Sequence, residues 1–182
     1  MRITGGNLRG RIIHPPIHLP IRPTTDFAKT ALFNILNNYF NFETLTVLDL
    51  FSGAGSIAYE FISREALSVT CIDEDINCIK FIKKTAGDLK MTNLHCFRSD
   101  VFHYIKQTEH QSDIIFADPP FALEETDHIP EIVFEKKLLK ENGWLIIEHQ
   151  SKRTLKSKIK SFDQRKYGNC AFTMFRLQEN MN

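Results

Sequence analysis

The segment Asp49-Leu50-Phe51-Ser52-Gly53-Ala54-Gly55-Ser56-Ile57-Ala58 decides the fold class. Residues 46–50 are apolar enough to form a fully buried strand, and residues 56–63 have the spacing of a helix. The two glycines between them match a Gly-x-Gly-x-x-Ala turn, in which a backbone without Cβ atoms approaches a ligand closely. This spacing is a weak signal on its own, and a tight turn that needs glycine is the alternative explanation.

Strands and helices alternate along the rest of the chain. Buried strands are expected at residues 46–50, 69–72, 94–97, 113–117 and 144–147. Helices are expected at residues 27–37, 56–63, 76–89, 101–106 and 129–139. This alternation predicts an α/β protein with a doubly wound, mostly parallel sheet. Residues 171–177 alternate with period two after a turn at 167–169, which predicts an added C-terminal antiparallel strand.

The first 23 residues have a different character. Arg2-Ile3-Thr4 and Arg11-Ile12-Ile13 flank a glycine-rich turn, which predicts a small N-terminal β-hairpin. Prolines between residues 15 and 23 then exclude helix and force an extended chain. We therefore expect a basic hairpin extension at residues 1–23, followed by the main domain at residues 24–182.

Charge is distributed unevenly along the 182 residues, although the net charge is only +1. Residues 1–30 carry +4 and residues 151–176 carry +7, whereas residues 31–150 carry −9. Brought to one face, the two basic segments would bind a polyanion such as nucleic acid, and separate solvated faces are the alternative.

Composition also limits the class of protein. No apolar run approaches the roughly 18 residues that span a bilayer, and the N-terminus lacks the apolar stretch of a signal peptide. We therefore expect a cytoplasmic protein without a membrane partner. The four cysteines are scattered and form no Cys-x-x-Cys pair, so a disulfide framework or a zinc site is not expected.

Three acidic residues are associated with successive strands. Asp49 lies near the end of the first, Asp73 follows the second, 20 residues after Gly53, and Asp100 follows the third. The carboxyl ends of parallel strands meet at one edge, where open α/β sheets bind ligands. Asp73 is placed to accept hydrogen bonds from a ribose, and Asp100 either accepts from an adenine amine or caps a helix. These acids predict a pocket for NAD or S-adenosylmethionine, and the acid ahead of the glycines favours the latter, because a carboxylate repels phosphate.

Asp118-Pro119-Pro120-Phe121 follows the strand at 113–117. The prolines hold the backbone outward and leave the Asp118 carboxylate and nearby carbonyl groups as fixed acceptors. An exocyclic base amine is a poor nucleophile, and a group that accepts its protons favours attack on a sulfonium methyl group. Phe121 would stack on the base. A proline-stiffened loop with an Asx turn is the structural alternative.

Together these motifs resemble class I S-adenosylmethionine-dependent amino-methyltransferases, through the D-x-F-x-G-x-G turn, the acid after the next strand and D-P-P-F. More narrowly, Arg2-Ile3-Thr4-Gly5-Gly6, Arg9-Gly10-Arg11, Arg22-Pro23-Thr24-Thr25-Asp26 and Leu32-Phe33-Asn34 resemble the RsmD type. That family methylates guanine N2 in small-subunit ribosomal RNA. The resemblance implies a Rossmann-like class I methyltransferase fold, with residues 24–182 as the S-adenosylmethionine-dependent domain.

The resemblance also implies roles for individual residues. The implied cofactor-binding residues are Asp49, Phe51, Ser52, Gly53, Gly55, Asp73, Asp100, Val101 and Thr24. The residues implied to present the target amine are Asp118, Pro119, Pro120 and Phe121. The residues implied to contact the substrate are Arg9, Arg11 and Arg22. The family's arginine-glutamate pair in the helix after R-P-T-x-D is replaced by Phe27-Ala28-Lys29-Thr30.

The implied cofactor is S-adenosylmethionine, and the implied partner is ribosomal RNA within a small-subunit assembly particle, bound by a monomer without a metal. Guanine offers two adjacent donors, N1–H and the N2 amine, whereas adenine N1 is an acceptor and would face Asp118 badly. Adenine-N6 methylation of DNA, methylation of protein glutamine and a non-catalytic RNA-binding module are the alternatives.

Overall fold

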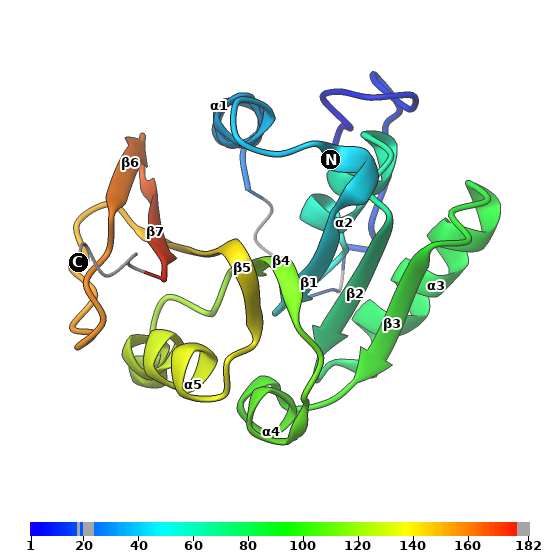
Figure 1. Cartoon of the computed structure of the whole chain (residues 1–182). Helices are drawn as coiled ribbons and strands as arrows, with labels where there is room; N and C mark the ends of the chain where they lie inside the picture. Colours follow the sequence, from blue (N-terminus) through cyan, green and yellow to red (C-terminus); the bar gives the residue numbers. More distant parts are fainter. Residues whose placement is uncertain (18, 20–23, 178–182) are drawn as a thin grey trace.

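The computed structural model describes residues 1–17, 19 and 24–177, and its centre is one seven-stranded sheet (Figure 1). The strands are β1 (Thr46–Leu50), β2 (Ser68–Asp73), β3 (Leu94–Arg98), β4 (Ser112–Ala117), β5 (Leu139–Gln150), β6 (Asp163–Tyr167) and β7 (Cys170–Arg176). Their order is β3-β2-β1-β4-β5-β7-β6, with β1 to β5 parallel and β7 and β6 antiparallel. The predicted doubly wound, mostly parallel sheet is confirmed.

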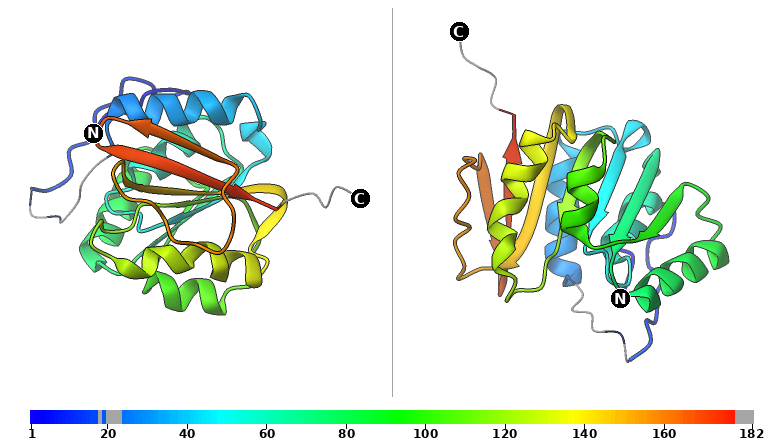
Figure 2. Two further views of the ribbon diagram at one scale, coloured as in Figure 1. Left: turned by 90° about the vertical axis from the view of Figure 1, so that its left-hand side faces the viewer. Right: turned by 90° about the horizontal axis from the view of Figure 1, so that it is seen from below.

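Helices cover both faces of this sheet (Figure 2). They are α1 (Asp26–Asn37), α2 (Ser56–Ser63), α3 (Ile76–Asp88), α4 (Val101–Gln107) and α5 (Ile129–Glu135), with the short 3₁₀ turns η1 (Phe42–Thr44) and η2 (Glu124–His128). One core joins α1, α2 and α3 to the sheet, and the other joins α4 and α5 to its opposite face. Among the helices of the described residues, none combines the length and hydrophobicity needed to span a bilayer.

The strand order reverses between β1 and β4. From β1 the chain builds β2 and β3 on one side and then returns to place β4 on the other. Leu50 pairs with Ala117, so the turn after β1 and the loop after β4 leave the sheet at the same level. Such a switch point is where open α/β sheets bind ligands.

The helix predicted at 129–139 is too long. α5 ends at Glu135, Lys137 has a φ of 54°, and the Leu138 N–H donates to the Val133 carbonyl. Leu138 and Leu139 continue the apolar spacing of the helix, but their burial belongs to the start of β5. The strand predicted at 144–147 is therefore the central part of a longer one.

Strand β6 is absent from the sequence prediction, which has one antiparallel strand instead of two. Its residues are polar, and the strand lies at the edge of the sheet with its middle residues exposed. An edge strand with both sides in water shows no alternation of polar and apolar residues. The predicted turn before β7 is confirmed at residues 168–169.

The N-terminal hairpin is present but short, with Arg2 and Ile12 forming its isolated antiparallel bridge. The Ile3 N–H donates to the Arg11 carbonyl over 2.9 Å, and the Ile13 N–H donates to the Met1 carbonyl over 2.9 Å. Ile3 and Ile13 are buried in the same core as α1 and α2. The hairpin is thus packed on the main domain, and the proposed boundary at residue 23 lies outside the described residues.

Gly6 allows the hairpin to approach α2 closely. Its φ is 73°, and a Cβ atom there would overlap the Ser63 carbonyl group. The Asn7 N–H donates to that carbonyl over 2.6 Å, and the Ser63 hydroxyl donates to the Gly5 carbonyl over 2.6 Å. The hairpin tip is therefore held at the C-terminal end of α2.

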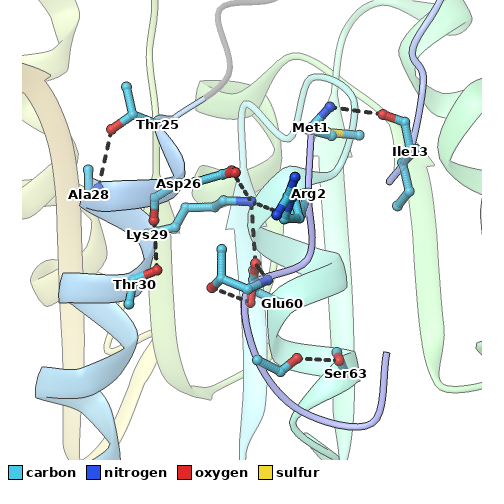
Figure 3. Close-up of polar contacts among 12 residues, drawn as sticks. Met1, Arg2, Ile13, Thr25, Asp26, Ala28, Lys29, Thr30, Glu60 and Ser63 are labelled. Atoms are coloured by element: carbon cyan, nitrogen blue, oxygen red, sulfur yellow. Dashed lines mark hydrogen bonds and ion pairs between the residues drawn. The ribbon is translucent and has the colours of Figure 1, made fainter. Parts of the chain in front are cut away.

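A buried ion pair between α1 and α2 holds the base of the hairpin (Figure 3). Lys29 Nζ lies 3.3 Å from Glu60 Oε1, with both side chains at most 1% exposed, and donates to the Arg2 carbonyl over 2.5 Å. Glu60 also accepts from the Thr4 N–H over 2.6 Å and forms an ion pair with Arg64. These contacts connect two helices and the N-terminal hairpin through a cluster of charges centred on Lys29 and Glu60.

The two basic segments lie on opposite faces of the sheet over only part of their length. Ile3 and Ile13 of the hairpin pack with the α1, α2 and α3 core, whereas Leu155 and Ile159 pack against the α4 and α5 core. Further along the second segment, Phe172 is buried in the α1, α2 and α3 core, and the Tyr167 ring lies with its centroid 5.9 Å from that of Phe27. The two segments therefore meet beside α1.

Lys29→Ala is expected to lower the free energy of unfolding by about 3 kcal/mol, because Glu60 stays buried without its lysine partner. Urea unfolding measures the change. The exposed Lys84–Asp88 pair on α3 is the matched control, and Lys84→Ala is expected to cost less than about 0.5 kcal/mol. Equal effects of the two variants would show that the buried pair contributes nothing specific.

Candidate active site

A pocket of about 760 Å³ lies at the carboxyl edge of the sheet, beside the switch point of β1 and β4. The predicted cofactor residues that line it are Thr24, Asp49, Phe51, Ser52, Gly53, Asp73, Asp100 and Val101. All four residues of the segment Asp118-Pro119-Pro120-Phe121 line the same pocket. The turn after β1 and the loop after β4, which are far apart in sequence, are thus two walls of one pocket.

The other predicted residues lie elsewhere. Arg9 and Arg11 are exposed on the hairpin, and Arg22 lies outside the described residues. Gly55 is at the N-terminus of α2 with a φ of 81°, and a Cβ atom there would come within 2.9 Å of the Tyr59 ring. Glycine is therefore required at position 55 by the turn and by packing on α2, which was the alternative explanation for this motif.

The turn after β1 is strained and tightly bonded. Phe51 has a φ of 59°, a conformation that costs free energy for a residue with a side chain. The Ser52 hydroxyl lies 2.7 Å from the Asp49 carbonyl and 3.1 Å from the Ile72 carbonyl, so it connects the ends of β1 and β2. Ser52 therefore supports the shape of the pocket wall.

Asp73 is held in a fixed orientation at the end of β2. Its Oδ2 accepts from the Gly53 N–H over 2.8 Å, and its Oδ1 accepts from the Asp75 N–H over 2.9 Å. Burial raises the pKa of Asp73, and the two backbone hydrogen bonds oppose that rise. Each carboxylate oxygen keeps a further lone pair for a ligand hydroxyl.

The helix-cap interpretation of Asp100 is confirmed. Its Oδ1 accepts from the His103 N–H over 2.7 Å and so caps α4. The same residue lines the pocket, next to the buried Val101. The cap orients a carboxylate that also contributes to the pocket wall.

Asp49 is the most unusual group in the pocket wall. It is 2% exposed, and its Oδ2 has no hydrogen-bond partner among the described residues. Burial, followed by the nearby Asp73 carboxylate, raises the pKa of Asp49 well above its ordinary value. An unpartnered buried carboxylate oxygen is costly, and it points to a ligand that brings a donor or a positive charge.

The loop after β4 is fixed to the sheet at its first residue. The Asp118 N–H donates to the Leu50 carbonyl at the end of β1 over 3.3 Å. Further along, the Leu123 N–H donates to the Pro120 carbonyl over 2.9 Å. The position of Asp118 therefore follows directly from the pairing of β1 with β4.

Several pocket residues have no signal in the local sequence. Met1 lines the pocket from the hairpin, and Phe102 lines it from α4. The centroid of the Phe102 ring lies 6.2 Å from that of the Phe51 ring. Thr24 is a predicted pocket residue, but its anchor is not predicted: its hydroxyl donates to Glu148 Oε2 over 2.7 Å, across 124 positions of sequence. These contacts depend on tertiary packing and leave no local pattern.

The family model described as Conserved hypothetical protein 95 matches residues 1–176. The chain belongs to this family. It is 34% identical over 151 residues to "Ribosomal RNA small subunit methyltransferase D" of Escherichia coli K12, covering 81% of this chain and 71% of the relative. It is 31% identical over 154 residues to the protein of the same name from Buchnera aphidicola subsp. Acyrthosiphon pisum, covering 84% and 80%. The predicted RsmD-type resemblance is confirmed.

A solved structure of a similar protein supports the fold of this chain. "Putative methyltransferase yhhF from Escherichia coli" superposes with a TM-score of 0.81 at 26% identity and covers 96% of both chains. The Rossmann-like class I methyltransferase fold is therefore confirmed for this chain.

Asp49→Asn is expected to raise the free energy of unfolding at neutral pH by about 1 kcal/mol. A carboxyl group whose pKa is raised in the folded state stabilises the fold fully only below its unfolded value, near 3.8. That contribution is lost as the pH rises toward the folded-state pKa, and an amide at position 49 avoids the loss.

Urea unfolding of the Asp49→Asn variant and the unchanged protein, near pH 7 and near pH 4, measures this effect. The gain is expected near pH 7 and becomes smaller near pH 4. A gain of equal size at both values would contradict the titration of Asp49.

Proposed function

We propose that the protein transfers a methyl group from S-adenosylmethionine to the exocyclic N2 of a guanine in small-subunit ribosomal RNA. Membership of the family and the names of its relatives support methylation of ribosomal RNA. The observation that carries the proposal is the pocket itself, which joins the acids at or just beyond the carboxyl ends of β1, β2 and β3 to the Asp118–Phe121 segment.

The set of hydrogen-bond acceptors fits S-adenosylmethionine. The unpartnered Asp49 Oδ2 suits the α-ammonium group, and the fixed Asp73 carboxylate suits the ribose hydroxyls. Asp100, which lines the pocket, would accept from the adenine amine, with Val101 and Phe102 as apolar contacts. The volume of about 760 Å³ lies in the range of ligand pockets. When bound, the cofactor supplies a methyl group on a positively charged sulfur.

The protein's own contribution is to hold the target amine. Asp118 would accept hydrogen bonds from the amine as positive charge develops on its nitrogen, and Phe121 would stack on the base. Because the Asp118 backbone is bonded to the end of β1, the acceptor is fixed relative to the cofactor wall. Such positioning and electrostatic stabilisation need no metal.

Guanine suits this acceptor better than adenine does. Its N1–H and N2 amine are adjacent donors, so one carboxylate accepts from both, whereas adenine offers a ring acceptor next to its amine. The preference for guanine N2 over adenine N6 or a glutamine amide rests on this complementarity.

The hairpin is proposed to bind RNA phosphates away from the target base. It runs along α2 from Met1, in the pocket wall, to the C-terminal end of that eight-residue helix, about 12 Å away. Arg9 and Arg11 are exposed near its tip. Residues 1–23 would then be an RNA-binding extension of a catalytic domain at 24–182. The assembly particle, the monomeric state and the cytoplasmic location stay predictions.

Asp118→Ala is expected to lower kcat for methyl transfer by about 10²–10³-fold, because a fixed acceptor at the reacting amine is lost. Cofactor affinity, measured by calorimetry, is expected to stay unchanged. Asp88→Ala on the exposed surface of α3 is the control. Unchanged transfer by Asp118→Ala would remove the catalytic role.

The modified nucleoside identifies the substrate. Mass analysis of ribosomal RNA from cells that lack the protein is expected to show the loss of one N2-methylguanine, which the purified protein restores with labelled cofactor. Loss of N6-methyladenine, or labelling of a protein instead, would replace the proposed substrate.

Replacing Arg9 and Arg11 with alanine is expected to weaken RNA binding and to make it less sensitive to salt. Each lost phosphate contact lowers the slope of log K against log salt by about 0.7–0.9. Titrations at several salt concentrations measure the slope. An unaltered slope would remove the hairpin from the RNA surface.

A further inference from the structure

The side chain of Arg153 is bonded to the loop that follows Asp118. Its Nη1 donates to the Phe121 carbonyl over 3.3 Å and to the Leu123 carbonyl over 3.0 Å. Its Nη2 donates to Asp127 Oδ1 over 3.1 Å. One guanidinium group therefore holds three acceptors within residues 121–127, and its side chain is only 19% exposed.

The backbone of Arg153 is fixed to the sheet from the other side. Its N–H donates to the Gln150 carbonyl over 2.9 Å, at the end of β5, and the Ser151 N–H donates to the Asn169 carbonyl over 3.0 Å. Strand β5 is the neighbour of β4, which carries Asp118 at its end. Arg153 thus links the carboxyl end of β5 to the loop that follows β4.

The segment after Arg153 is also held in place. Leu155 and Ile159 pack against the core of α4 and α5. Glu131 of α5 accepts from the Ser157 hydroxyl over 3.1 Å and from the Lys158 N–H over 2.6 Å. The base of the Arg153 side chain is therefore rigid enough to position what its guanidinium group contacts.

Arg153 adds a side-chain anchor to the hydrogen bonds that the loop makes at its first residue and within itself. Pro119 and Pro120 have no N–H to donate. Leu123 accepts from the Thr126 hydroxyl over 2.7 Å, which shapes the start of η2 but reaches neither strand. The Arg153 guanidinium group donates to the carbonyl of Phe121, directly after the two prolines.

We propose that Arg153 is a positioning residue for methyl transfer, which holds Phe121 and with it the Asp118–Phe121 segment in the geometry that receives the target base. This inference rests on the proposed function of that segment. Positive charge alone would make Arg153 a phosphate contact of the basic segment 151–176. The N–H groups of its guanidinium instead donate to the loop at residues 121–127. The neighbouring Lys152 is exposed and keeps its charge in solvent.

A lysine cannot replace this side chain. The guanidinium fork presents several N–H groups in one plane, whereas an ammonium group is a point charge on a flexible stem. Arg153→Lys therefore keeps the charge and removes the simultaneous contacts to two carbonyl groups and Asp127. This variant separates a positioning role from a phosphate contact.

The test measures Arg153→Lys in two ways. With ribosomal RNA as substrate, kcat is expected to fall about ten- to hundredfold, with KM for the cofactor unchanged. Hydrogen exchange at the Leu123 and Thr126 amides is expected to become faster, while exchange in α2 stays the same. Asp127→Asn removes one of the three contacts, and smaller changes in the same direction are expected.

Lys152→Ala is the contrasting variant. It is expected to leave hydrogen exchange in residues 121–127 unchanged. An Arg153→Lys variant with unchanged kcat overturns the inference, whatever its exchange. So does one that only weakens RNA binding and lowers its salt slope, because that result assigns Arg153 to phosphate. If the protein without substitutions methylates no RNA, the proposed function fails. Separately, if hydrogen exchange is the same in Arg153→Lys and Asp127→Asn as in the protein without substitutions, the positioning role is overturned.

Discussion

The parallel pairing of β1 with β4 is the constraint on which the candidate site depends. The register that places Leu50 beside Ala117 brings the glycine turn and the Asp118 loop out of the sheet at one level. Asp118 is then bonded directly to the Leu50 carbonyl. A shift of one residue in this register would reverse which side chains face each core and move Asp118 relative to Asp49. The cofactor wall and the loop for the target base are therefore two results of one strand pairing.

Local patterns were sufficient to predict the parallel sheet and most of the pocket. Asp49, Asp73, Asp100 and Asp118 each come near the end of a buried strand, and topology alone gathers such residues at one edge. The length of α5 and strand β6 could not be predicted, because apolar spacing continues past the helix and is missing from an exposed edge. Contacts made by Arg153 and Lys29 involve remote partners, and a linear pattern shows only that each is a cation.

The charges of the protein serve two different purposes. Acids gather in the pocket, where the unpartnered carboxylate oxygen of Asp49 is complementary to a cationic ligand. Of the basic residues, Lys29 and Arg153 are used inside the structure, to hold the hairpin and the loop. Arg9 and Arg11 stay exposed and available to an anionic partner. Net charge along the sequence therefore overstates the surface that can bind RNA.

The hydrogen bond from Thr24 to Glu148 has a consequence for biosynthesis. One wall of the pocket is anchored by a residue that leaves the ribosome early, and its partner lies 124 positions later in the chain. The first β-α-β units can form while translation continues, since their contacts are local. The pocket is complete only after β5 has emerged, so a nascent chain that has already exposed the glycine turn and the Asp118 loop still lacks a finished binding site.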